Sequence, residues 1–119
     1  MEKIITHLDN YLKDRPTMEE NNSDPQRVFE LLMGEIAELN EAILTGHLIA
    51  PEMADVAIFL ITLASNFDIN LEKEIMTKIG RNMAKYPASE FQEGDYTEAR
   101  LKCQRDWINL GGDNAFYSD

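Results

Sequence analysis

Two rows of acidic residues, each with the spacing of a helix face, constrain this chain more than any other feature. Acids recur every three residues on either side of a break: Glu35, Glu38 and Glu41 before it, and Glu52 and Asp55 after it. Residues three apart share a helix face, and like charges there repel by roughly 0.2–0.5 kcal/mol per pair. No Lys or Arg lies between Arg27 and Lys73 to offset that repulsion. A divalent cation between the rows is the simplest source of positive charge, and a solvated acidic surface is the alternative.

The hydrophobic pattern predicts an all-α protein. Apolar residues recur at helical spacing, and no long stretch alternates with the period of a strand. The predicted helices cover residues 1–14, the segment from Pro25 to a stop at Gly46, the segment from about Ala50 through the apolar run 53–65, residues 71–85 and residues 96–110, with residues 16–24 as a polar loop. We expect a bundle of four main helices plus a C-terminal helix, in a single domain over residues 1–110, followed by a tail of residues 111–119.

The helix that begins near Ala50 is apolar on nearly every side. A helix of this kind is buried all round, either at the centre of a bundle or in a subunit interface. A chain of 119 residues forms only one small bundle. We therefore expect a homodimer or a homotetramer.

Charge and cysteine content restrict the partners and the compartment. The net charge is −11, which argues against binding to nucleic acid or to anionic membranes, because phosphate backbones need a basic surface. It leaves room for a small phosphorylated substrate whose charge is bridged by metal ions. The single cysteine, Cys103, has no partner in the chain and is predicted to be a buried thiol, which favours a cytoplasmic protein.

The one local concentration of positive charge lies on the predicted helix 71–85. Lys78, Asn82 and Lys85 follow one another at steps of four and three residues, with Arg81 beside them, and Tyr86 with the following proline ends the helix. Residues at these steps share a face. The pattern indicates either a site for an anion or a solvated helix face.

Together these motifs resemble those of the MazG-like all-α nucleotide pyrophosphohydrolases, a group that includes MazG, the dimeric dUTPases and the dCTP pyrophosphatases. The similarity covers residues 25–87 and rests on three motifs in order: Glu35-x-x-Glu38, Glu52-x-x-Asp55 and Lys78-x-x-x-Asn82-x-x-Lys85-Tyr86-Pro87. The resemblance implies a four-helix-bundle-like core of the MazG type and nucleotide contacts from Lys78 and Asn82. It also implies magnesium ligands at four acids: Glu35, Glu38, Glu52 and Asp55. Members of the group often carry Arg where this chain has Lys85.

The implied activity is hydrolysis of an NTP or dNTP to the monophosphate and pyrophosphate, a reaction of nucleotide-pool housekeeping. Mg²⁺ is the expected cofactor, with Mn²⁺ as a substitute, because a bound divalent ion lowers the pKa of water and polarises phosphorus. Either Glu38 or Glu41 would accept the proton of that water. Lys78 would neutralise charge on the leaving pyrophosphate. The remaining candidate substrate-binding residues surround it in the sequence: Arg81, Asn82, Lys85 and Tyr86.

Other functions stay open on the sequence alone. A non-catalytic nucleotide-binding or regulatory helical protein would keep the same fold. A carboxylate-bridged di-iron bundle needs Glu-x-x-His pairs, and neither His7 nor His47 stands three residues after a glutamate. Trp107 is predicted to lie in the core or in an interface rather than against a base. The sequence does not specify which base and sugar are preferred.

Overall fold

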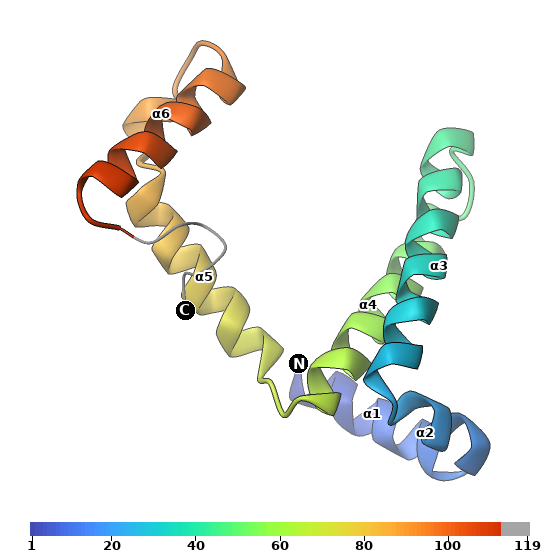
Figure 1. Ribbon diagram of the computed structural model, residues 1–119. Coiled ribbons are helices and arrows are strands. Elements are labelled where there is room, and N and C mark those ends of the chain that lie inside the picture. The colour runs from blue at the N-terminus through green and yellow to red at the C-terminus, as the bar shows by residue number, and fades with distance from the viewer. Residues whose placement is uncertain (113–119) are drawn as a thin grey trace. The chain divides into compact units, whose positions relative to one another are not determined.

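The computed structural model describes residues 1–112, and in this part of the chain every regular element is a helix. The all-α prediction is therefore confirmed. The elements in chain order are α1 (Glu2–Lys13), α2 (Pro16–Asn22), α3 (Pro25–Thr45), α4 (Ile49–Asn66), α5 (Leu71–Lys85), the 3₁₀ helix η1 (Ala88–Phe91) and α6 (Tyr96–Asn109) (Figure 1).

The chain divides into two compact units, Met1–Glu72 and Lys73–Asp119. The single domain over residues 1–110 and the bundle of four main helices stay predictions. Of the predicted tail, residues 113–119 lie outside the described part of the chain.

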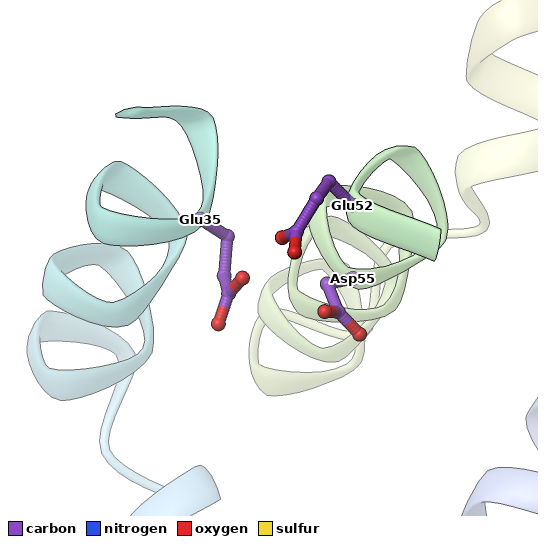
Figure 2. Close-up of side chains that lie close together, drawn as sticks. All are labelled: Glu35, Glu52 and Asp55. Carbon is purple, nitrogen blue, oxygen red and sulfur yellow. The ribbon is translucent and has the colours of Figure 1, made fainter. Parts of the chain in front are cut away.

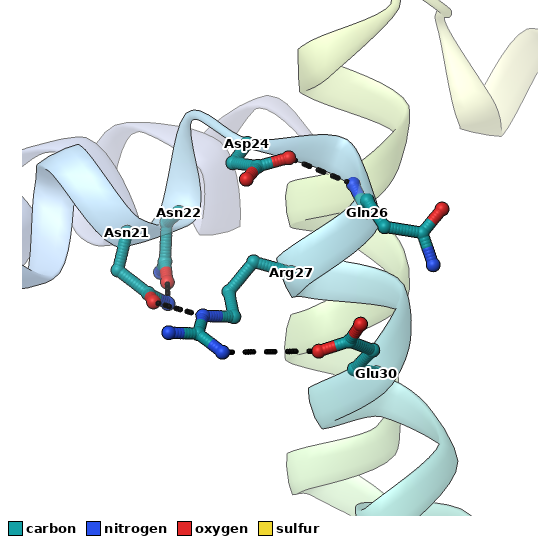
Figure 3. Close-up of polar contacts among 6 residues, drawn as sticks. All are labelled: Asn21, Asn22, Asp24, Gln26, Arg27 and Glu30. Carbon is teal, nitrogen blue, oxygen red and sulfur yellow. Dashed lines mark hydrogen bonds and ion pairs between the residues drawn. The ribbon is translucent and has the colours of Figure 1, made fainter.

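In the first unit, α3 and α4 form an antiparallel helical hairpin (Figure 1). The start of α3 is fixed as the sequence predicts, because Pro25 occupies the first turn and the Asp24 carboxylate accepts a hydrogen bond from the Gln26 amide at 3.1 Å (Figure 3). Its end is fixed by Gly46, which has a φ of 70° and lets the His47 amide donate to the Ala42 carbonyl at 3.1 Å. These two signals set the length of α3 and the place where the chain reverses.

The predicted loop at residues 16–24 is wrong in its greater part, since residues 16–22 form the seven-residue helix α2. Pro16 suits the first turn because its φ is already helical, and the Ser23 hydroxyl donates to the Glu20 carbonyl at 2.6 Å at the other end. The prediction failed because α2 buries none of its residues, so its sequence carries no apolar stripe.

Arg27 ties α2 to α3 (Figure 3). Its Nε donates to the Asn21 side-chain oxygen at 3.2 Å, and its Nη1 lies 3.8 Å from a Glu30 carboxylate oxygen. This arginine is the last cation before the acidic rows. Asn21 lies on α2 and Glu30 lies in the first two turns of α3, so both contacts are at the base of the hairpin.

Within the first unit, α4 is not buried on every side. Ile61, Thr62 and Ala64 are buried, whereas large apolar side chains such as Met53 and Leu60 remain exposed. The alternative that α4 belongs to a subunit interface stays a prediction. Among the described helices, α4 is also the one long and apolar enough to cross a membrane, a property shared with core helices of soluble proteins. A cytoplasmic protein that binds no membrane stays a prediction too.

The second unit contains most of α5 together with η1 and α6. Asp95 caps α6 as predicted, accepting a hydrogen bond from the Glu98 amide at 2.9 Å. Lys102 on α6 binds Glu90 of η1 at 2.9 Å, which holds the 3₁₀ turn against the helix. Cys103 is buried, so the predicted buried thiol is confirmed.

Candidate functional site

The two acidic rows meet across the α3–α4 hairpin (Figure 2). Glu35 projects from α3, and Glu52 and Asp55 project from the first two turns of α4. One carboxylate oxygen from each lies within 4.8 Å of the other two. The antiparallel packing produces this arrangement, because each acid lies on the side of its helix that faces the neighbouring helix.

The electrostatics of this acid cluster favour a positive ion. Partial burial is the largest cause of a raised pKa at both Glu35 and Glu52, and the surrounding acids raise it further. Glu38 contributes to both shifts, through its charge and through hydrogen bonding, and the charge of Asp55 also adds to both. Every acid added to the cluster therefore makes its neighbours harder to ionise, unless a cation compensates.

The unpaired oxygens of the cluster fit a metal site. One carboxylate oxygen of Glu35 and one of Glu52 are buried and have no hydrogen-bond partner in the described structure. A buried carboxylate oxygen without a partner is costly, and a hard divalent cation would satisfy both. The cluster contains carboxylates only, which is the donor set that magnesium and manganese prefer.

The structure separates the two candidates for the proton acceptor. Glu38 is solvent-exposed and lies close enough to Glu35 and Glu52 to shift the pKa of both. Glu41 is exposed one turn further along α3 and does not contribute to either shift. Electrostatic coupling places Glu38 beside the acid cluster, and the assignment of the base to Glu38 or Glu41 stays a prediction.

The predicted basic motif gathers around one cavity in the second unit. This cavity has a volume of about 240 Å³ and its lining includes every predicted substrate-binding residue: Lys78, Arg81, Asn82, Lys85 and Tyr86. Lys85 also places its Nζ 5.4 Å from the centre of the Tyr86 ring. We call this space the cationic cavity.

Two residues of the cationic cavity were missed by sequence reasoning. Arg100 and Trp107 reach it from α6, outside the segment that carries the family resemblance. Their spacing of seven residues places them on one face of a helix, but this spacing alone does not predict a binding site. The cavity is formed only because α6 lies beside the residues of α5 in the folded unit. Trp107 lines this cavity, and its predicted place in the core or in an interface stays a prediction.

Tyr86 contacts several polar and cationic side chains of the second unit. Its hydroxyl accepts a hydrogen bond from the Gln104 side-chain amide at 3.2 Å. Burial opposes ionisation of the phenol, but hydrogen bonds with Gln104 and Arg100 and the charges of Lys85 and Arg100 outweigh it, so the pKa of Tyr86 is lowered. The lowered pKa reports the positive potential at this point of an otherwise acidic protein.

Comparisons of the chain with models of protein families, with curated proteins and with solved structures find no match. The resemblance to the MazG-like group therefore rests on the three sequence motifs alone.

Proposed function

We propose that this protein is a metal-dependent nucleoside triphosphate pyrophosphohydrolase with a MazG-like core. The observation that carries the proposal is the acid cluster, in which Glu35, Glu52 and Asp55 bring carboxylate oxygens within 4.8 Å of one another across two helices. Two of these side chains also bury an oxygen that lacks a partner. Acids on a solvated surface would spread apart rather than converge with buried oxygens.

The acid cluster would hold Mg²⁺, or Mn²⁺ in its place, through Glu35, Glu52 and Asp55, with Glu38 as the fourth acid beside them. A divalent ion held there would lower the pKa of water and screen the charge of the triphosphate. Glu38 would accept the proton of the attacking water, since it is exposed and lies beside the other acids. As the water oxygen bonds to the α-phosphorus, the bond from this phosphorus to the oxygen that bridges it to the β-phosphorus would break, and the monophosphate and pyrophosphate would leave.

The second unit carries positive charge of the kind that phosphate groups bind. Lys78, Arg81 and Lys85 line the cationic cavity together with Asn82, a side chain that can both donate and accept hydrogen bonds. Amino and guanidinium groups stabilise phosphate oxygens and the charge that develops on a leaving pyrophosphate. In this proposal Lys78 neutralises the leaving group, and its neighbours bind the rest of the nucleotide.

One screen tests the activity. Purified protein is incubated with ordinary, deoxy and modified nucleoside triphosphates, and phosphate and pyrophosphate are assayed separately, with Mg²⁺, with Mn²⁺ and with a chelator. We expect pyrophosphate to be released in a 1:1 ratio with the monophosphate, only when metal is present. Release of single phosphates, or the same turnover in the chelator, would contradict the proposal.

A second function is supported by the cationic cavity itself. A non-catalytic protein that binds nucleotide needs this cavity and not the metal. Saturable nucleotide binding without turnover of any triphosphate in the screen would favour that function. The proposed fold and the nucleotide-binding residues would be the same in both cases.

A further inference from the structure

A second cavity adjoins the cationic cavity and differs from it in chemistry. It has a volume of about 340 Å³, and three of its five lining residues are aromatic: Tyr86, Phe91 and Tyr96, beside Asn82 and Arg100. Asn82, Tyr86 and Arg100 line both cavities. We call the second space the aromatic cavity.

The aromatic cavity is built by a chain of ring contacts. The Phe91 ring lies edge-on to Tyr86 with centroids 6.0 Å apart, and its centroid lies 6.1 Å from that of the Tyr96 ring. η1 carries Phe91 into this position, and the Lys102–Glu90 ion pair holds η1 to α6. The three rings offer the apolar and aromatic surface that binds flat ring systems.

The lining of the cationic cavity also favours one class of ligand. Four cationic side chains line it, Lys78, Arg81, Lys85 and Arg100, in a protein with a net charge of −11. Amino and guanidinium groups bind phosphate oxygens through charge-assisted hydrogen bonds, so this lining suits a phosphorylated ligand. Arg100 is the residue of both cavities that can bind a phosphate in a bidentate manner while it stacks on a ring.

Trp107 is held at the rim of the cationic cavity by the end of α6. The Gly112 amide donates to the Trp107 carbonyl at 2.8 Å, and Gly111 has the positive φ of 86° that this ending requires. A Cβ atom built on Gly112 would overlap the Trp107 indole. Glycine is needed there because its backbone lies directly against the ring.

We propose that the two cavities form one nucleotide-binding pocket, with the phosphates in the cationic cavity, the base in the aromatic cavity, and Arg100 at the junction as a substrate-binding residue contributed by α6. The choice of a nucleotide rests on the proposed function. The broader ligand class, an anion joined to an aromatic ring, rests on the two cavities alone. The pocket lies wholly in the second unit and needs no metal.

The only tryptophan of the chain lines this pocket, so its fluorescence reports binding directly. The full chain is titrated in a chelator with a nucleoside triphosphate, with the matching nucleoside and with inorganic pyrophosphate, and N-acetyltryptophanamide corrects for absorption by the base. We expect saturable quenching by the triphosphate, at least tenfold tighter than that by the nucleoside or by pyrophosphate.

Two matched variants test the roles within the pocket. Arg100→Gln should weaken triphosphate binding at least tenfold, whereas Arg105→Gln, an exposed arginine on the same helix outside both cavities, should leave it unchanged. Tyr96→Ala should weaken binding of the triphosphate and leave binding of pyrophosphate unchanged. The proposed pocket would be contradicted if the two arginine variants bound triphosphate with equal affinity. It would also be contradicted if pyrophosphate bound as tightly as the triphosphate.

The pocket and the hydrolase can fail independently. In one outcome, Arg100→Gln turns over triphosphate with an unchanged Michaelis constant, and no ligand quenches Trp107. That outcome would support the proposed hydrolase and contradict the proposed pocket. Quenching that Arg100→Gln abolishes, in a protein that hydrolyses no triphosphate, would support the pocket and contradict the hydrolase.

Discussion

Glu38 is the residue on which the proposed chemistry depends most. Glu38→Gln keeps the size of the side chain but removes the proton acceptor, so we expect turnover to fall by at least a hundredfold. Glu41→Gln removes an acid from the same helix that does not shift the pKa of Glu35 or Glu52, and we expect its turnover to stay within a few-fold of the wild type. Steady-state kinetics on both variants decides the assignment, and near wild-type turnover in Glu38→Gln would leave the acid cluster without a catalytic role.

The raised pKa values of Glu35 and Glu52 predict how the metal-free protein responds to pH. Both carboxyls hold their protons more tightly in the folded state than at the ordinary pKa of 4.5 in the unfolded chain. Their contribution to the free energy of unfolding is therefore greatest below about pH 4.5, and it is lost as the pH rises through the raised values. Mg²⁺ should reverse the loss, because it binds the ionised carboxylates.

Thermal melting between pH 4.5 and 7.5, with Mg²⁺ and with a chelator, measures this effect. We expect Mg²⁺ to raise the melting temperature at pH 7 and to raise it less at pH 5. Glu52→Gln should flatten the pH dependence of the metal-free protein and reduce the magnesium shift, while Glu41→Gln should retain both. An equal magnesium shift in Glu52→Gln and in the wild type would place the bound ion elsewhere.

At the scale of residues, the acid cluster could be predicted from the sequence and the nucleotide pocket only in part. Helical geometry is local, so acids three residues apart had to share a face, and a short turn at Gly46 had to bring the next helix back. The positions of Arg100 and Trp107 depend on how α6 folds onto α5, through contacts such as Gln104 to Tyr86. No spacing along the chain encodes a contact of that kind.

The helix α3 carries Glu35 and Glu38, and its first turn is stabilised by Asp24. Asp24→Ala removes the hydrogen bond to the Gln26 amide and should lower the free energy of unfolding by about 1 kcal/mol. Asp14→Ala is the matched control, because Asp14 follows the C-terminal end of α1, where a negative charge does not stabilise the helix dipole. Urea denaturation followed by circular dichroism measures both, and equal effects would show that Asp24 does not act as a cap.

At the scale of elements, helix ends with strong local signals were predicted within one or two residues. Asp24, Pro25 and Gly46 fixed α3, and Asp95 fixed the start of α6. α2 and η1 were not predicted, because both are short, bury no residue and depend on the elements beside them. Short helices without an apolar stripe have no periodic pattern that can be read from the sequence.

At the scale of the whole molecule, one side of the α3–α4 hairpin presents apolar side chains to solvent. On α4 the exposed apolar residues are Met53, Ala57 and Leu60, with Phe67 at the C-cap, and the buried Ala64 completes steps of four and three residues. On α3 the exposed apolar residues Phe29, Met33, Ile36 and Ile43 repeat those steps, with the polar Asn40 at the remaining position. Alternating steps of four and three are the pattern of helices that pack against other helices in coiled coils.

Both stripes lie on the same side of the hairpin. On each helix the stripe is rotated about the helix axis from the residues that face the neighbouring helix. The rotation is about 100°, the angle between consecutive residues, and it follows the direction in which the chain winds. Because the helices are antiparallel, these two rotations point the stripes the same way. α1 and α2 cover a different side, where their residues line a cavity with Asp55, Ile58 and Phe59 of α4. The hairpin therefore has one covered side and one apolar side that its own unit leaves uncovered.

We expect this apolar side to pair with the same side of a second copy, since two hairpins would complete a four-helix bundle and a two-fold dimer uses one surface twice. Sedimentation of the full chain at micromolar concentration should then give twice or four times 13.6 kDa. Leu60→Glu places a charge within the α4 stripe and should shift the protein toward the monomer with its helix content retained. Ile4→Glu changes a residue of similar exposure on α1, 49% against 43%, and should leave the assembly intact because it lies on the covered side. A wild-type species of 13.6 kDa would instead require the chain itself to cover the two stripes.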